Sequence, residues 1–242
     1  MAWRCSGKTN AELIANMQSA GLIHSQRVAE AMLRVDRANY VLPRAKAMAY
    51  EDSPQSISYN ATISAPHMHA HVAELLLSHL KPGSSVLDVG SGSGYMLAVF
   101  HQLTKTEPKR GHIVGIEHIQ GLTDFSVANM RNDGLADELR SKRIAVVTGD
   151  GRKGYETMGP YHAIHVGAAA STVPDALVEQ LARPGRLIIP VDNPKGSGQY
   201  VTYFDLWELW QIDKDTDGKV VRKKLFDVMY VPLTDAASQW EP

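Results

Sequence analysis

The segment that constrains the fold most is a glycine-rich turn between a short apolar run and a helical run. Val86 to Val89 is apolar except for Asp88, residues 90–94 read Gly-Ser-Gly-Ser-Gly, and helical periodicity begins at Tyr95. Glycines at such a point let the backbone turn tightly and let a ligand lie against bare amides. Further apolar runs with strand character follow at residues 113–116, 144–147, 161–166 and 186–190. Strands that alternate with helices predict a parallel sheet covered on both faces.

The rest of the chain is predicted from apolar spacing and turn residues. Thr9 is expected to cap the first helix, and Pro66 suits a first helical turn, where its missing N–H has no partner to lose. Residues 36–65 carry turn formers and are predicted as a long irregular stretch, and 215–218 as a turn between two strands. The remaining expected helices lie within 9–34, with a second helix over 25–35, and over 66–80, 123–132 and 174–181. Two further strands are expected over 199–212 and 225–233.

These elements predict an α/β fold with a Rossmann-like, doubly wound, mostly parallel sheet, a helical N-terminal cap and an antiparallel C-terminal strand. We expect one integrated domain in which residues 1–79 form the cap and a substrate loop, and residues 80–242 form the ligand-binding core. A chain of 242 residues is long enough to bury a sizeable core of this kind.

Composition excludes several classes of partner. The formal net charge is −1, from 25 basic and 26 acidic residues, whereas proteins that hold nucleic acid by its phosphates carry a basic surplus. The basic run Arg222 to Lys224 is expected on a solvated strand end or loop. The single cysteine, Cys5, allows no internal disulfide, and no apolar stretch approaches the ~20 residues that span a bilayer. We therefore expect a cytosolic protein that binds neither nucleic acid nor membranes.

The glycine spacing argues against a dinucleotide. A dinucleotide loop has the pattern Gly-x-Gly-x-x-Gly and places a pyrophosphate on a helix N-terminus, whereas Gly90, Gly92 and Gly94 follow Gly-x-Gly-x-Gly. The carboxylate of Asp88, inside the strand before the loop, would repel a pyrophosphate. The same carboxylate would attract an ammonium group, such as that of S-adenosylmethionine, which has no phosphates. Capping of the loop amides is the alternative role for Asp88.

Two further acids follow the next two strands. Glu117 ends the second strand, where one carboxylate accepts both hydroxyl hydrogens of a ribose, and Asp150 lies between two glycines after the third, where it could bond the amine of adenine. An exposed glutamate and an ordinary Gly-Asp-Gly turn are the alternatives. Ligands bind at the carboxyl ends of strands in open α/β sheets, so the three acids together favour an adenosyl ligand.

At this point the sequence resembles a known family. Residues 88–94 are similar to the first motif of class I methyltransferases, and Ala-Thr-Ile-Ser-Ala-Pro-His-Met-His-Ala at 61–70 resembles the loop specific to the protein-L-isoaspartate O-methyltransferases. The likeness runs from about Trp3 to Trp240. Residues 41–50 and 200–212 depart from the family pattern. The other similar segments are 52–55, 149–155, 163–170 and 230–235.

The resemblance implies S-adenosyl-L-methionine as cofactor and isoaspartyl proteins and peptides as substrates. The family methylates the free α-carboxylate of L-isoaspartyl residues, and the ester then collapses to a succinimide that can reopen to aspartate. The resemblance makes Ser64 the catalytic residue, Thr234 and Gln239 a C-terminal closure over the cofactor, and a monomer the usual form. The cofactor-binding residues expected are Ala61, Thr62, Ile63, Ser64, His69, Asp88, Gly90, Ser91, Gly92, Glu117, His118, Asp150, Gly151, Thr234 and Gln239.

The implied chemistry needs no general base, because an α-carboxyl group with a pKa near ~3.5 is already ionised at pH 7. Ser64 would orient the acceptor carboxylate through a hydrogen bond; helix capping before Pro66 is its alternative role. His67, His69 and His71 do not form a zinc-protease motif, so no metal is expected, and His69 is expected to donate a hydrogen bond to ligand or backbone.

Three alternatives stay open on the sequence alone. A different class I methyltransferase would share the glycine loop and the acids. An oxidoreductase that uses a nicotinamide cofactor would need the other glycine spacing and no Asp88. A catalytically inactive relative that only binds damaged proteins would keep the same residues from Ser64 to Asp150.

Overall fold

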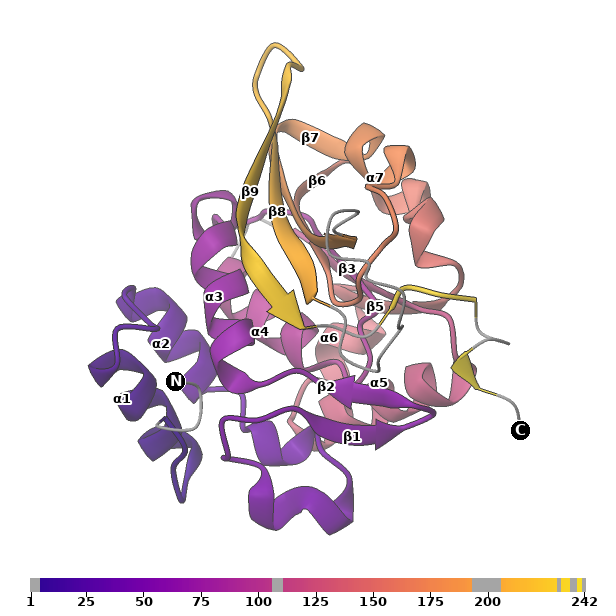
Figure 1. Cartoon of the computed structure of the whole chain (residues 1–242). Helices are drawn as coiled ribbons and strands as arrows, with labels where there is room; N and C mark the ends of the chain where they lie inside the picture. The colour runs from indigo at the N-terminus through magenta and orange to yellow at the C-terminus, as the bar shows by residue number, and fades with distance from the viewer. Residues whose placement is uncertain (1–4, 106–110, 193–205, 230–231, 236–238, 241–242) are drawn as a thin grey trace.

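The computed structural model describes residues 5–105, 111–192, 206–229, 232–235 and 239–240 (Figure 1). The helices are α1 Asn10–Ser19, α2 Gln26–Leu33, α3 Pro66–Leu76, α4 Tyr95–Thr104, α5 Gln120–Asn132, α6 Ala136–Arg140 and α7 Asp175–Glu179. The strands are β1 Gln55–Ser58, β2 Ala61–Ile63, β3 Val86–Val89, β4 Ile113–Glu117, β5 Ile144–Thr148, β6 Tyr161–Val166, β7 Leu181–Asp192, β8 Leu206–Lys214 and β9 Val220–Met229.

Seven strands form one sheet in the order β5-β4-β3-β6-β7-β8-β9, and β1 and β2 form a separate antiparallel pair. The pairs from β5 to β7 are parallel, and β8 is antiparallel to both of its neighbours. The predicted Rossmann-like α/β fold, with a mostly parallel sheet and an antiparallel C-terminal part, is therefore confirmed. The antiparallel part consists of the β8–β9 hairpin, whose connection is the predicted turn at 215–218.

Alternation along the strands divides the core into two layers. Val86 and Ile113 belong to a cluster that also contains buried residues of α1 to α5, whereas Leu87 and Val114 belong to a second cluster with Leu177 of α7. Successive strand residues point to opposite faces, so each cluster packs against one face of the sheet. The fold is therefore doubly wound, with most of its helical cover on one face.

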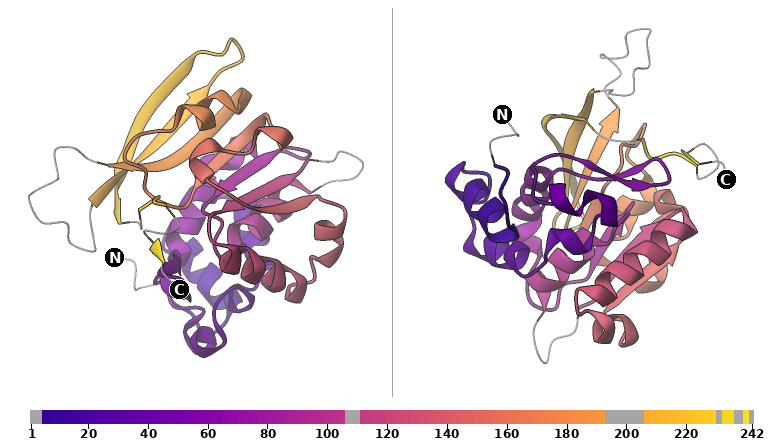
Figure 2. Two further views of the ribbon diagram at one scale, coloured as in Figure 1. Left: turned by 90° about the vertical axis from the view of Figure 1, so that its right-hand side faces the viewer. Right: turned by 90° about the horizontal axis from the view of Figure 1, so that it is seen from below.

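The N-terminal helices pack into the larger of these clusters. Leu13 and Met17 of α1 and Val28 and Met32 of α2 are buried in it, and α2 contacts α3 and α4. The side chain of Thr9 accepts a hydrogen bond from the amide of Glu12 (3.2 Å), which confirms the predicted cap of α1. In the left view of Figure 2 the indigo N-terminal helices lie at the bottom, and the β8–β9 hairpin forms the upper end of the sheet. The division of function between residues 1–79 and 80–242 remains a prediction.

The stretch 36–65 is more regular than predicted. It holds short 3₁₀ helices at Arg37–Asn39 and Pro43–Met48, the latter within the atypical 41–50 segment, and the β1–β2 hairpin. Positive φ angles at the hairpin turn, 77°, 53° and 54°, fall on Ser58, Tyr59 and Asn60. Because none of these is glycine, the usual hairpin signal of Asn-Gly or Asp-Gly is missing from the sequence.

Other boundaries also differ from the prediction. The helix from Pro66 ends at Leu76 and continues only as a 3₁₀ turn to His79, α5 begins at Gln120, and the short helix α6 was not predicted. Residues 199–205 of one predicted strand and 230–231 of the other lie outside the described residues. Arg222 to Lys224 lie inside β9 and are exposed there, so their predicted place at a strand end or loop was wrong. Among the helices of the described residues, none has the length and apolar character needed to cross a bilayer.

A test of the glycine loop compares two glycines in the left-handed region. Gly94 has φ +83° and a Cβ there would overlap with Ser126 Oγ, whereas Gly134 has φ +81° and no neighbour within 4 Å. Both substitutions to alanine carry the left-handed backbone cost of about 1–2 kcal/mol. We expect Gly94→Ala to lose about 1–3 kcal/mol more than Gly134→Ala, because Cβ would overpack the contact between α4 and α5. Urea unfolding of both variants measures this; equal losses would contradict the close approach.

Candidate active site

The candidate site lies where the chain reverses its direction across the sheet. The chain runs outward from β3 through β4 to β5 and then returns to place β6 on the other side of β3. The loops that leave the carboxyl ends of β3 and β6 therefore run in opposite directions. In open α/β sheets, ligands bind in the space between such loops. Gly90 and Gly92 after β3 and Gly167 after β6 line the space between them.

Two adjoining cavities occupy this position, and they share Thr62, Gly90, Gly92 and Gly167. All the residues predicted to bind the cofactor line one or both of them. Those in the first cavity alone are Ala61, Glu117, His118, Asp150, Gly151, Thr234 and Gln239. Those in the second cavity alone are Ile63, Ser64, His69, Asp88 and Ser91. The structure thus brings together segments that are up to about 180 residues apart in the chain.

Glu117 is held by backbone donors from two loops. Its carboxylate accepts hydrogen bonds from the amides of Gly92 (3.1 Å), His118 (2.8 Å) and Ile119 (3.3 Å), and the residue is buried. A carboxylate offers about four acceptor positions, so these bonds fix its orientation and leave capacity for a hydroxyl donor. The remaining capacity suits one ribose hydroxyl, whereas the predicted contact involved both.

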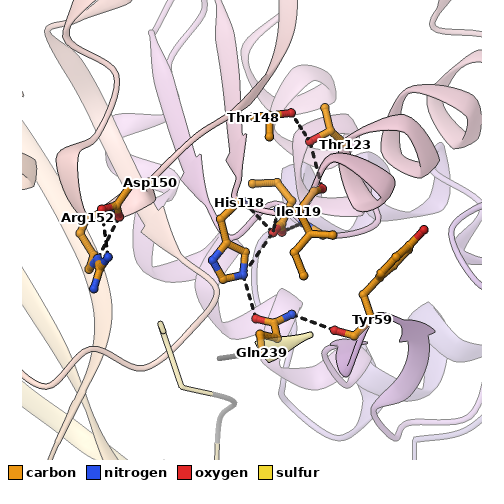
Figure 3. A network of polar contacts seen from close by, with 10 residues as sticks. Tyr59, His118, Ile119, Thr123, Thr148, Asp150, Arg152 and Gln239 are labelled. Atoms are coloured by element: carbon orange, nitrogen blue, oxygen red, sulfur yellow. Dashed lines mark hydrogen bonds and ion pairs between the residues drawn. The ribbon is translucent and has the colours of Figure 1, made fainter. Parts of the chain in front are cut away.

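Asp150 is engaged by a neighbour that the sequence reasoning did not select. Arg152 donates from Nε (2.9 Å) and Nη2 (3.0 Å) to the two oxygens of the Asp150 carboxylate (Figure 3). Its Nη2 atom also donates to Asp235. The Arg152 side chain holds the pKa of Asp150 below its ordinary value. Asp150 therefore stays anionic, and any contact with an adenine amine uses its remaining lone pairs.

Gln239 lines the first cavity and joins two segments that are distant from it in the chain. His118 Nε2 lies 2.8 Å from Gln239 Oε1, the Gln239 amide donates to the carbonyl of Tyr59 (3.0 Å), and Asn60 Nδ2 donates to the carbonyl of Gln239 (2.8 Å). Figure 3 shows Gln239 between His118 and Tyr59. The Trp240 ring also packs edge-on against Tyr59, with 5.5 Å between centroids. This Gln239 bridge, as we call these contacts, lies along one side of the cavity.

Asp88 forms a buried pair with a histidine on the neighbouring strand. Asp88 and His165 are register partners in β3 and β6, and Asp88 Oδ1 lies 2.6 Å from His165 Nδ1. The exposed fractions of the two residues are 2% and 5%. His165 Nε2 has no hydrogen-bond partner within the described part of the chain. Sequence reasoning missed His165, although its position near the end of β6 matches that of Asp88 in β3.

Ser64 is fixed through its backbone by Arg37, which sequence reasoning also missed. Arg37 Nη2 donates to the Ser64 carbonyl (2.9 Å), and Arg37 Nη1 lies 3.3 Å from His69 Nδ1. Burial lowers the pKa of Arg37 to about 10 and, with the charge of Arg37, holds the pKa of His69 well below its ordinary value. The N-cap of α3 is Ala65 and no side chain caps this helix, so the helix-capping role considered for Ser64 is wrong.

The other two histidines of the 61–71 segment have separate contacts. His67 Nδ1 lies 2.8 Å from Asp52 Oδ1, and the His71 ring lies 5.6 Å from the Phe226 ring on β9. Within the described residues there is no group of three or more histidine, cysteine or acidic side chains arranged to hold a metal ion.

Comparison with known proteins identifies the family to which this arrangement belongs. The model of the protein-L-isoaspartate(D-aspartate) O-methyltransferase family, PCMT, matches residues 8–238. The chain belongs to this family. A protein-L-isoaspartate O-methyltransferase of Caenorhabditis elegans is 44% identical over 240 residues, which is 99% of each chain. In Arabidopsis thaliana, protein-L-isoaspartate O-methyltransferase 1 is 46% identical over 230 residues, covering 95% of this chain and 93% of the relative.

A solved structure of the PCMT family has the same fold. A Plasmodium falciparum chain described as a protein-L-isoaspartate O-methyltransferase, in complex with S-adenosyl-L-homocysteine, superposes with a TM-score of 0.81. The two sequences are 32% identical, and the match covers 94% of this chain and 99% of the other. The family resemblance stated from the sequence motifs is therefore confirmed over nearly the whole chain.

The neutral His69 gives this site a predictable pH response. Its folded-state pKa lies below the ordinary 6.5, so the unfolded chain takes up a proton first as the pH falls. The stability contribution is complete above pH 6.5 and is lost below it, by up to about 1.4 kcal/mol per pH unit. We expect His69→Gln to lose less stability than the wild type between pH 7 and 5, as measured by urea unfolding. Equal slopes for the two proteins would show that His69 is not buried in its neutral form.

Proposed function

We propose that this chain is a protein-L-isoaspartate O-methyltransferase, which transfers a methyl group from S-adenosyl-L-methionine to the free α-carboxylate of L-isoaspartyl residues in damaged proteins and peptides. The observation that carries this proposal is the pair of cavities between the loops that follow β3 and β6. The chain is also 44% identical, over 99% of its length, to a relative named protein-L-isoaspartate O-methyltransferase. The complex of the Plasmodium relative with S-adenosyl-L-homocysteine supports the choice of cofactor.

The residues of the two cavities fit the cofactor in chemical terms. Glu117 would accept a hydrogen bond from a ribose hydroxyl, Asp150 and Gly151 would contact the adenine, and Asp88 would face the ammonium group. Gly90 and Gly92, which have no side chain, would leave room for the sulfonium end. Three acids and no lysine or arginine line these cavities, which suits a ligand with cationic groups and no phosphate.

The chemistry needs positioning more than proton transfer. S-adenosyl-L-methionine supplies an electrophilic methyl group, and the acceptor is a carboxylate that is already ionised at neutral pH. The chain therefore has to align donor and acceptor and exclude water, and such alignment is worth roughly 7–11 kcal/mol. Ser64, at the end of β2 in the second cavity, would orient the acceptor by a hydrogen bond. The methyl ester formed would then collapse to a succinimide outside the chemistry of this site.

The cellular location, the oligomeric state and the partners of the protein are also proposals. We propose a cytosolic monomer whose partners are isoaspartyl proteins and peptides and which uses neither nucleic acid nor metal. The net charge of −1 supports the first exclusion, and the lone cysteine, which is buried, suits a reducing compartment.

The direct test is transfer of labelled methyl groups from S-adenosyl-L-methionine to a synthetic isoaspartyl peptide. The matched aspartyl peptide is the control, because it differs only in which carboxyl joins the chain. We expect base-labile labelling of the isoaspartyl peptide alone. Equal labelling of both peptides would defeat the specificity, and labelling of neither would indicate the non-catalytic binder.

A second experiment separates cofactor binding from acceptor positioning. Loss of one hydrogen bond to a charged group costs roughly 1.5–3 kcal/mol, and 1.4 kcal/mol is tenfold in an equilibrium or a rate. We expect Asp88→Ala to raise the dissociation constant of S-adenosyl-L-homocysteine about 10- to 100-fold in titration calorimetry. Ser64→Ala should lower turnover by a similar factor with the cofactor affinity nearly unchanged. Unchanged affinity in the Asp88 variant would show that the cationic end lies elsewhere.

A further inference from the structure

Arg37 is a buried cation without a carboxylate partner. Its exposed fraction is 0%, and no salt bridge within the described residues includes it. Although burial lowers its pKa to about 10, the guanidinium remains protonated at neutral pH. Buried charges in proteins are normally paired, because an isolated charge in a dry interior is costly. Within the described residues no carboxylate lies at ion-pair distance from Arg37, so its charge can act on an anion bound nearby.

Two buried acids, Asp52 and Asp88, make no ion pair with Arg37 within the described residues. Asp52 acts on Arg37 electrostatically; its Oδ1 atom accepts from the backbone amide (3.0 Å) and ring (2.8 Å) of His67, and its Oδ2 atom has no hydrogen-bond partner there. Asp88 is paired with His165. The face of the guanidinium rests over the Tyr95 ring, 5.7 Å from its centroid, which stabilises a cation without neutralising it.

Both residues that the Arg37 guanidinium nitrogens contact line the second cavity. One nitrogen supports the Ser64 carbonyl and the other reaches His69 Nδ1, and both of these residues line that cavity. Arginine only donates hydrogen bonds, so His69 Nδ1 accepts and its Nε2 atom carries the ring hydrogen. The tautomer of His69 is thereby fixed, and its Nε2–H donor remains for a ligand.

We propose that Arg37 is a positioning residue for a carboxylate bound in the second cavity, acting through the Nε2–H donor of His69 and the placement of Ser64. The charge draws the anion, and the two residues in front of it provide the hydrogen bonds. This inference rests on the proposed function, which supplies two carboxylates: that of the acceptor and that of the methionine end of the cofactor.

A structural role alone would not require a charge. The buried Asn10 side chain performs such a role in this chain, because its neutral Nδ2 donates to the carbonyls of Met32 (3.0 Å) and Val35 (3.3 Å) and joins α1 to α2. An amide could support the Ser64 carbonyl in the same way, without the desolvation cost of a guanidinium. The charge of Arg37 therefore points to a ligand.

The experiment compares Arg37→Met and Arg37→Lys with the control Arg27→Met. Arg27 also donates to two backbone carbonyls, those of Leu80 (2.7 Å) and Leu103 (3.0 Å), but lines neither cavity of the site. Titration calorimetry measures binding of S-adenosyl-L-homocysteine and of its decarboxylated analogue. Recognition of the acceptor carboxylate is measured by steady-state kinetics with an isoaspartyl peptide. The competitor in these assays is the same peptide with its α-carboxylate amidated.

The wild type should prefer the carboxylate-bearing member of at least one ligand pair by about 10-fold or more. Arg37→Met should lose that preference, Arg37→Lys should retain part of it, and Arg27→Met should keep it whatever its thermal stability. If Arg37→Met loses the preference for S-adenosyl-L-homocysteine over its decarboxylated analogue, the carboxylate that Arg37 positions is that of the cofactor. If it loses the preference for the isoaspartyl peptide over the amidated peptide, and KM rises, the carboxylate is that of the acceptor.

Two results would overturn the proposal: a wild type that distinguishes neither pair, or an Arg37→Met variant that retains the full preference. The wild-type measurement stands even where the variants do not fold. Failure of the proposed function is seen separately, as a wild type that binds the cofactor but labels no isoaspartyl peptide.

Discussion

The parallel pairing of β3 with β4 on one side and with β6 on the other is the constraint on which the site depends. It forces the loops after β3 and β6 apart and directs Asp88, Glu117 and Asp150 toward one edge of the sheet. The same pairing makes Asp88 and His165 direct neighbours. Burial of both strand faces, in two separate hydrophobic clusters, keeps this edge rigid.

Much of this arrangement was predictable because it follows from local pattern. Short apolar strands, helical periodicity and three glycines in five residues fixed the type of unit, and strand ends fixed where acids would converge. The residues predicted for the cofactor all line the two adjoining cavities. Their individual roles depend on a ligand and remain proposals. Segment 61–70 was located through its resemblance to a family, since its residues carry no strong structural pattern.

What the sequence did not reveal depends on contacts between distant residues. The β1–β2 turn was missed because Ser58, Tyr59 and Asn60 adopt positive φ without glycine, supported by contacts with Gln239, about 180 residues further on. Arg37 looks like an ordinary surface arginine in the sequence, and only the folded chain shows it beneath Ser64 and His69. Arg152 was passed over for the same reason, because its second acceptor, Asp235, is distant in the chain.

The construction of the Gln239 bridge bears on how spent cofactor leaves. Gln239 and Trp240 are held by three hydrogen bonds, to or from His118, Tyr59 and Asn60, and by one aromatic edge contact. At a net 0.5–1.5 kcal/mol each, the three bonds resist opening by roughly 2–5 kcal/mol. Contacts of this strength can break by local fluctuation while the sheet stays intact. Each reaction cycle can then exchange its adenosyl product without partial unfolding of the domain.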